Sequence, residues 1–120
     1  MLNRITYWNR ILNTYLFKKG SNLLFWHGEP EINLNFKNTE KFSYYMKFEY
    51  KANYDNVLDK SGVPMLDYSG NIGKKYNPIA IAQYGLGNFN LYLETEDISR
   101  REKVLSSAVW LKKNIVKNEL

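Results

Sequence analysis

The sequence predicts an α+β fold: an amphipathic N-terminal helix, a small antiparallel β-sheet and a C-terminal helical hairpin, in one domain of residues 1–120. At both ends of the chain, apolar residues recur every three or four positions, which is the period of a helix with one buried face. Between these ends, every second residue of the segment 42–51 is a large apolar or aromatic one. That period of two is typical of a strand with one buried face. A chain of 120 residues, of which 44 % are hydrophobic, can bury one modest core.

The N-terminal helix is expected within residues 1–20. Its apolar stripe consists of Leu2, Ile5, Trp8, Leu12, Tyr15 and Leu16. Lys18, Lys19 and Gly20 are typical of a helix end, because cations favour the negative end of the helix dipole and glycine suits the position after the last turn. Arg4, Asn9, Arg10 and Asn13 interrupt any continuous apolar run, so the segment is not a secretory signal peptide. We expect the stripe to pack against the rest of this chain or against a second copy.

The sheet and its loops are expected within residues 21–75. The segment FSYYMKFEYK, residues 42–51, predicts the main strand, and residues 63–68 predict a short strand that pairs back onto it. The intervening DKSG, residues 59–62, indicates a turn. The segment YSGNIGKKYN, residues 68–77, is expected to be a loop because it holds two glycines and two asparagines.

The first helix of the hairpin is predicted from the uncharged stretch YNPIAIAQYGLGNFNLYL, residues 76–93. Asn77 suits the N-cap and Pro78 the first helical position. The helix falls short of the about twenty predominantly apolar residues that cross a bilayer, so we expect no membrane span. A glycine inside a helix costs up to ~1 kcal/mol relative to alanine. Gly85 and Gly87 therefore indicate close approach by another element or by a ligand.

The second helix of the hairpin is predicted to follow at once, capped by Asp97 or by Ser99. Its apolar stripe consists of Val104, Leu105, Ala108, Leu111 and Ile115. Because few residues separate the two helices, they should lie antiparallel and together occupy residues 76–120.

Charge and composition limit the partners. The net charge is +5 and the basic surplus lies at the two ends of the chain, which would attract nucleic acid, anionic membrane or acidic polysaccharide. No nucleic-acid recognition motif accompanies the charge, so we expect no nucleic acid partner. The ten tyrosines suit either a sugar-binding surface or the wet margin of a core. One histidine and no cysteine predict neither a thiolate nor a histidine metal site, and no cofactor is indicated. Without a signal peptide, a cytoplasmic location is the default expectation.

The stretch GVPMLDYSGNIGKKYNPIAIAQYGLGNFNLYL, residues 62–93, resembles the D-glucuronyl C5-epimerase family. Members of that family convert D-glucuronate to L-iduronate within heparan-type polysaccharides. The core of the resemblance is YNPIAIAQYGL, residues 76–86, while ANYDNVLDKSGVP, residues 52–64, and AVWLKKN, residues 108–114, are also similar to bacterial members. Family members continue into a catalytic barrel of paired α-helices. The resemblance therefore implies the N-terminal part of such an enzyme, in which the hairpin is the start of an incomplete α/α barrel.

The family's chemistry assigns roles to individual residues. Epimerisation removes a proton from carbon 5 of the uronate and returns one to the opposite face, which requires an acid and a base on two sides of the sugar ring. The resemblance implies that Tyr54, in KANYDN, transfers a proton. A second family tyrosine falls at Phe89, which has no hydroxyl and so departs from the family's pattern. Gln83 and Tyr84 belong to the motif itself and would line the cleft or join the helix to the strands.

The basic residues before the first hairpin helix are candidates for binding the substrate carboxylate. Lys74, Lys75 and Tyr76 precede a helix N-terminus, where backbone N–H groups and the helix dipole attract anions. An exposed loop with two solvated lysines is the alternative. The substrate-binding candidates are thus Lys74, Lys75, Tyr76, Gln83, Tyr84 and Phe89.

Three functional hypotheses remain open from the sequence. The first is a fragment or short paralogue of the epimerase that is inactive alone, because it supplies at most one wall of a two-sided site. The second is a non-catalytic subunit that binds a uronic-acid-containing polysaccharide. The third is an interaction protein that completes its helical layer with another copy or with a partner chain, since uncovered apolar stripes usually mark interfaces.

Overall fold

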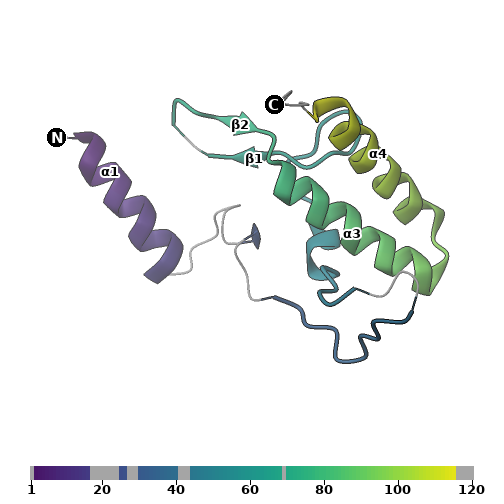
Figure 1. Ribbon diagram of the computed structural model, residues 1–120. Coiled ribbons are helices and arrows are strands. Elements are labelled where there is room, and N and C mark those ends of the chain that lie inside the picture. The colour runs from purple at the N-terminus through teal and green to yellow at the C-terminus, as the bar shows by residue number, and fades with distance from the viewer. Residues whose placement is uncertain (1, 17–24, 27–29, 41–43, 69, 116–120) are drawn as a thin grey trace, which may run out of the picture.

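The computed structural model describes residues 2–16, 25–26, 30–40, 44–68 and 70–115. Along the chain, an N-terminal helix is followed by a loop-rich middle region with a two-stranded antiparallel sheet, and then by two helices (Figure 1). The predicted α+β class with a C-terminal helical hairpin is confirmed. Within the described ranges, every helix is too short or too polar to cross a lipid bilayer.

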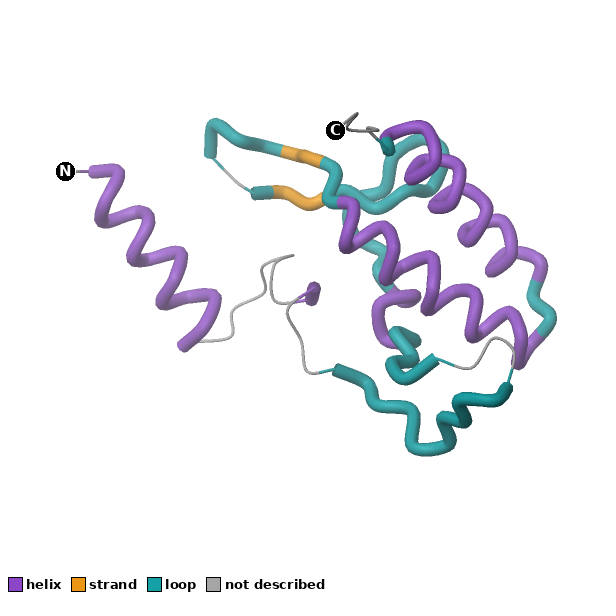
Figure 2. The backbone as a smooth tube through the Cα atoms, viewed as in Figure 1, coloured by secondary structure: helices purple, strands orange, loops and turns teal. Residues whose placement is uncertain are grey.

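The hairpin consists of α3 (Pro78–Thr95) and α4 (Ile98–Asn114), which lie side by side in Figures 1 and 2. The predicted cap of α3 is confirmed, because Asn77 Oδ1 accepts the backbone N–H groups of Ile79 at 3.0 Å and Ala80 at 3.2 Å. These bonds satisfy two of the helix's unpaired amide groups, and Pro78 has no N–H that needs a partner. The local sequence therefore fixes where the helix begins.

The turn between the two helices is set by backbone conformation and a second cap. Glu96 takes the left-handed conformation with φ 56°, and its N–H donates to Tyr92 O at 2.8 Å, which ends α3. Asp97 then begins α4, since its Oδ1 accepts the Ser99 N–H at 2.8 Å. Of the two predicted caps, Asp97 is the one that the structure contains.

The sheet is shorter than predicted and pairs differently. β1 (Leu66–Asp67) lies antiparallel to β2 (Lys74–Lys75), with Leu66 opposite Lys75 and Asp67 opposite Lys74. β1 falls inside the predicted strand of residues 63–68, but its partner falls inside residues 68–77, which we predicted as a loop. Gly70 and Gly73 both have φ 64°, a conformation that glycine adopts without strain, and they allow the chain to reverse between the strands (Figure 2).

The strand predicted over residues 42–51 is wrong for its described part, residues 44–51. Met46 forms only an isolated bridge with Ile32, Phe48 has φ 56°, and the 3₁₀ helix η2 (Tyr50–Asn53) follows. The backbone bonds that follow Phe48 are local: Lys51 N–H donates to Phe48 O at 3.0 Å and Ala52 N–H to Glu49 O at 3.1 Å. The segment lies against α3, where Asn90 Nδ2 donates to Lys47 O. Its burial does not alternate as a half-buried strand requires, because Tyr50 is exposed and the next residue, Lys51, is buried.

The core lies between α3 and the loop that precedes β1. Its buried members are Trp26, Tyr54, Leu66, Ala80 and Tyr84, with Phe25 and Tyr68 partly buried against them. Gly87 confirms the predicted close approach, because a Cβ built on it would lie 2.9 Å from the carbonyl carbon of Phe48. Gly85 also has a close neighbour, but the approach is looser: a Cβ built on it would lie 3.1 Å from Ser107 Cβ.

The N-terminal helix stands apart from this core in Figure 1. α1 (Leu2–Ile11) continues as the π-helical turn η1 (Leu12–Leu16). Of its predicted stripe, Ile5 is 61 % exposed and Trp8 57 % exposed, so these side chains are not packed against the rest of the chain. Arg10 Nη1 donates to Tyr68 O at 3.2 Å. Packing against a second copy stays a prediction, and the predicted end of the helix at residues 18–20 lies outside the described residues.

Candidate functional site

A surface hollow of about 320 Å³ lies between the turn at residues 59–63 and α4. We call it the turn–α4 hollow. Its lining residues are Asp59, Ser61, Val63, Leu105, Ser106, Val109, Trp110 and Lys113. It combines a carboxylate, two hydroxyls, an indole ring and an ammonium group with an apolar floor, which is the mixture typical of ligand sites.

Asp59 holds the turn together. Its Oδ1 accepts the N–H groups of Ser61 at 2.8 Å and Val63 at 3.0 Å, and its Oδ2 accepts the Tyr76 hydroxyl at 2.8 Å. Burial raises the pKa of Asp59, but the hydrogen bonds from Val63, Tyr76 and Ser61 outweigh burial and hold the pKa below its ordinary value. The carboxylate is therefore ionised at neutral pH. The Gly62 N–H also donates to Asp59 O at 3.0 Å, which confirms the predicted DKSG turn.

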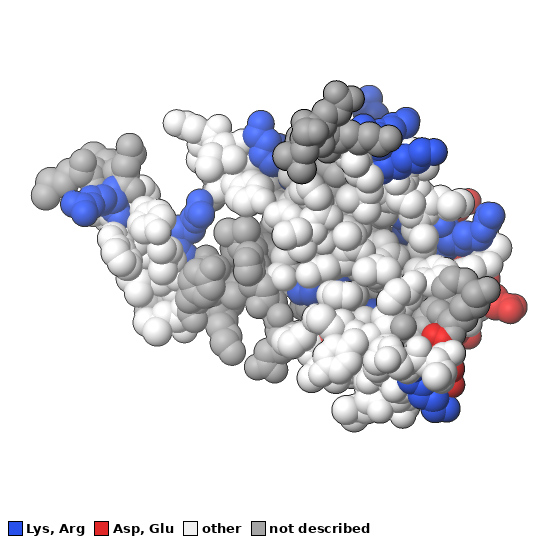
Figure 3. All heavy atoms as spheres, viewed as in Figure 1, with Lys and Arg blue, Asp and Glu red and all other residues white. Residues whose placement is uncertain are grey.

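Tyr76 joins the turn at residues 59–63 to α4 by contacting one lining residue of the hollow on each side. Its ring centroid lies 5.0 Å from that of Trp110, with 39° between the planes. Its hydrogen bond to Asp59 raises the pKa of Tyr76, so the phenol remains a donor. Lys113 lies three residues after Trp110 on α4, and residues at that spacing share a helix face. Figure 3 shows basic side chains over the C-terminal end of α4.

The predicted substrate-binding residues are not brought together. Tyr76 contacts two residues of the turn–α4 hollow, and Lys74 and Lys75 are exposed in β2. Phe89 lies elsewhere, on an apolar groove of about 460 Å³ between α3 and α4, where its ring centroid is 6.3 Å from that of Tyr44. Phe89 therefore lies on a different surface from Tyr76, whereas Lys74 and Lys75 directly precede Tyr76 in the chain.

Tyr54, the predicted proton-transfer residue, lies in the core and is 4 % exposed. Its hydroxyl donates to Met65 O at 2.8 Å and accepts the Val57 N–H at 3.4 Å. Burial raises the pKa of Tyr54, although the hydrogen bond from the Val57 N–H opposes this. In this arrangement the hydroxyl links two backbone segments and does not face a substrate cleft.

Tyr84 and Gln83 lie on α3 and face the interior. Tyr84 is fully buried, and its hydroxyl has no hydrogen-bond partner among the described residues. Burial raises the pKa of Tyr84, while the positive charge of Arg100 lowers it. Gln83 Oε1 is likewise buried and without a partner within the described ranges. Of the two roles that we considered for Tyr84, its burial favours joining the helix to the neighbouring segments.

Removing the two phenolic hydroxyls is expected to have opposite effects on stability. Tyr54→Phe should lower the free energy of unfolding by about 1–2 kcal/mol, because the Met65 carbonyl and the Val57 N–H lose their partner. Tyr84→Phe should leave it unchanged or raise it by up to about 1 kcal/mol, because it removes a buried hydroxyl that has no partner. Urea unfolding of both variants checks this, and equal losses would contradict the assignment of Tyr84.

Sequence reasoning missed Asp59, Trp110 and Lys113. We predicted DKSG only as a turn, and AVWLKKN only as a helix that resembles the family. Trp110 lies off the predicted apolar stripe of its helix, and that displaced aromatic is the one signal in the sequence that points to this surface. The residues on the opposite side of the hollow, Asp59, Ser61 and Val63, lie about fifty positions earlier in the chain, and no local pattern reveals that proximity.

No family model matches this chain, and neither a curated protein nor a solved structure gives a significant match. Among the described residues, no three carboxylate or histidine side chains gather in a way that could hold a metal ion.

Proposed function

We propose that this chain is a non-catalytic relative of the D-glucuronyl C5-epimerases that binds a uronic-acid-containing polysaccharide in the turn–α4 hollow. The observation that supports binding is the placement of the Asp59 carboxylate, the Tyr76–Trp110 ring pair and Lys113 at one surface. The family kinship comes from the resemblance of residues 62–93 to that family.

Each group in the hollow suits one feature of a uronate sugar. The face of Trp110 offers an apolar surface to the C–H groups of a pyranose ring. Asp59 is ionised and accepts hydrogen bonds, so a sugar hydroxyl can donate to it. The Lys113 ammonium provides the opposite charge for the carboxylate of the uronate. The volume of about 320 Å³ lies at the small end of ligand sites, roughly 300–1,000 Å³, and suits a single sugar unit of a longer chain.

The same geometry argues against catalysis by this chain alone. Inversion at carbon 5 needs proton-transfer groups on both faces of the ring. The only hydroxyl that the resemblance assigns to this step, that of Tyr54, lies in the core and bonds to Met65 and Val57. The second position is Phe89, which has no proton to give and lies on the groove between α3 and α4.

The test compares two neighbouring lysines in the last turn of α4, of which only Lys113 lines the hollow. Lys113→Ala and Trp110→Ala should each weaken binding of a heparosan oligosaccharide about tenfold, which corresponds to about 1.4 kcal/mol. Lys112→Ala removes the same charge outside the hollow and should weaken binding less than twofold. Isothermal titration calorimetry at low salt measures the three affinities. Equal losses for Lys112→Ala and Lys113→Ala would mean attraction by net charge alone and would contradict the site.

The absence of catalysis is tested on the same sample. Incubation of the chain with heparosan in deuterated water should leave the deuterium content at carbon 5 equal to that of a protein-free control. The readout is NMR of the recovered polysaccharide. Incorporation at an enzyme-like rate would contradict the non-catalytic part of the proposal. The binding part would still be tested separately, by the affinities of the Lys112→Ala and Lys113→Ala variants.

A further inference from the structure

Lys51 is a lysine placed almost wholly inside the chain, with 7 % of its surface exposed. Lysines are rarely buried to this degree unless they are paired with an acid. In the described ranges, no carboxylate lies within salt-bridge distance of its Nζ, which instead donates a hydrogen bond to the Phe25 carbonyl. The rings of Phe25, Trp26 and Tyr50 surround it, with Nζ–centroid distances of 5.4, 5.8 and 5.7 Å.

A small cavity of about 60 Å³ adjoins this amine, and we call it the Lys51 cavity. Its lining residues are Trp26, Pro30, Glu31, Met46, Phe48, Tyr50, Lys51 and Gln83. Two of them carry buried polar atoms without a partner among the described residues: the donor Trp26 Nε1 and the acceptor Gln83 Oε1. Buried polar atoms normally have a partner, so the residues around this cavity include one donor and one acceptor whose hydrogen-bonding capacity is unused. Its volume equals that of about two water molecules in the liquid, at ~30 Å³ each.

Burial also changes the amine itself. It lowers the pKa of Lys51, and the negative charge of Glu31 opposes this only in part. More of this amine is therefore neutral near pH 7 than is the case for an exposed lysine. A neutral lysine in an apolar pocket is the form that attacks carbonyl groups.

We propose that Lys51 is a carbonyl-capture site, where its amine condenses with an aldehyde small enough to occupy the Lys51 cavity. The nitrogen attacks the carbonyl carbon, a C–N bond forms, and a proton passes from nitrogen to the carbonyl oxygen to give a carbinolamine. Loss of that hydroxyl as water leaves an imine. Glu31 lines the same cavity, and its two carboxylate oxygens accept the Tyr50 N–H at 2.9 and 3.0 Å. We assign this carboxylate the role of taking the proton from nitrogen and returning it to the departing hydroxyl.

The test treats the folded chain at pH 7 with acetaldehyde and cyanoborohydride, which reduces any imine to a stable ethylamine. Peptide mass spectrometry then gives the rate at each lysine. Lys51 should be ethylated several-fold faster than Lys60, which is exposed on the turn at residues 59–62. Benzaldehyde exceeds the Lys51 cavity in size, so with it the order should reverse.

A slow reaction at Lys51 would contradict the proposal. If Lys51 serves only to bond Phe25 O and to pack among the rings, it should be the slowest lysine in the folded chain and should react only after unfolding in urea. That outcome, or equal preference for both aldehydes, would overturn the proposal. Lys51→Arg keeps a cation at this position and should remove only the fast-reacting peptide from the spectrum, with the rate at Lys60 unchanged.

Discussion

Gly87→Ala is expected to destabilise the chain by about 3 kcal/mol, the upper part of the usual range for an overpacked interior. A Cβ at this position would lie 2.9 Å from the carbonyl carbon of Phe48, with the carbonyl oxygen closer still, and 3.2 Å from Ala52 Cβ. The first two atoms belong to backbone, which cannot turn away as a side chain can. The segment of residues 48–53 would have to lift from α3, and it carries Lys51. The gain of up to ~1 kcal/mol that alanine brings to a helix offsets only part of this loss.

Gly85→Ala is the matched control for that prediction. It lies two residues earlier on α3, gains the same helix propensity, and meets a side chain: its Cβ would lie 3.1 Å from Ser107 Cβ and 3.6 Å from Ser107 Oγ. A shift of a few tenths of an ångström in α4 relieves this contact, so the free energy of unfolding should stay within about 1 kcal/mol of the unmodified chain. Urea unfolding of both variants measures the difference. Equal losses would mean that Phe48 does not lie against Gly87.

The elements that the sequence predicted correctly are those whose signals are local. Asn77 and Pro78 sit side by side in the sequence and act on the same helical turn, and Asp97 acts on Ser99 two residues away. Such signals need no knowledge of the rest of the fold. The glycines of α3 were also informative. Glycine lowers the stability of a helix, so its presence there predicts that another element packs closely against it, although the sequence does not say which element.

The prediction for residues 42–51 failed because an alternating sequence does not determine how the backbone is paired. In the described part the covered side chains also depart from the alternation, with Lys51 buried and Tyr50 exposed. The backbone of Phe48 fits against Gly87, about forty residues later, and the chain turns there into η2 instead of continuing as a strand. The turn–α4 hollow was missed for a related reason. Asp59, Tyr76 and Trp110 meet only after the hairpin has folded against the turn, and each one alone looks like an ordinary turn, loop or helix residue.

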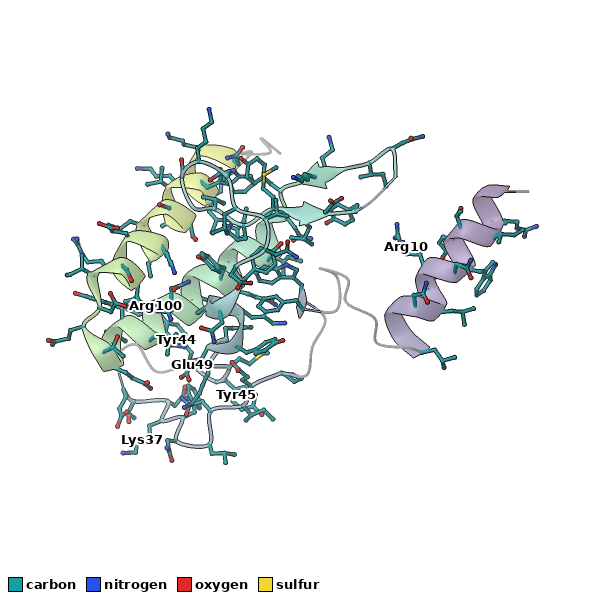
Figure 4. All side chains as sticks on the ribbon, turned by 180° about the vertical axis from the view of Figure 1, so that it is seen from behind. Arg10, Lys37, Tyr44, Tyr45, Glu49 and Arg100 are labelled. Carbon is teal, nitrogen blue, oxygen red and sulfur yellow. The ribbon has the colours of Figure 1, made fainter. Side chains whose placement is uncertain are left out.

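Arg100→Met is expected to lower the free energy of unfolding by about 2–3 kcal/mol, because it leaves two carbonyl oxygens without their donor. Arg100 Nη1 donates to Asn88 Oδ1 at 3.0 Å and to Ala52 O at 3.2 Å, and so ties α4 to both α3 and η2 (Figure 4). Asn88 is fully buried and uses its Nδ2 to donate to Tyr84 O at 2.9 Å. Its Oδ1 therefore cannot turn to solvent for a replacement.

The neighbouring Arg101 provides the control for charge. It is exposed on α4, and Arg101→Met should change stability by no more than about 0.5 kcal/mol. A double-mutant cycle with Asn88→Ala then isolates the contact itself, with an expected coupling of about 1–2 kcal/mol between positions 88 and 100. Each single variant also loses other contacts, and the double-mutant cycle subtracts those losses and leaves the energy that the two positions share. A coupling near zero, or equal losses for the two arginine variants, would mean that the hairpin is held by its apolar contacts alone.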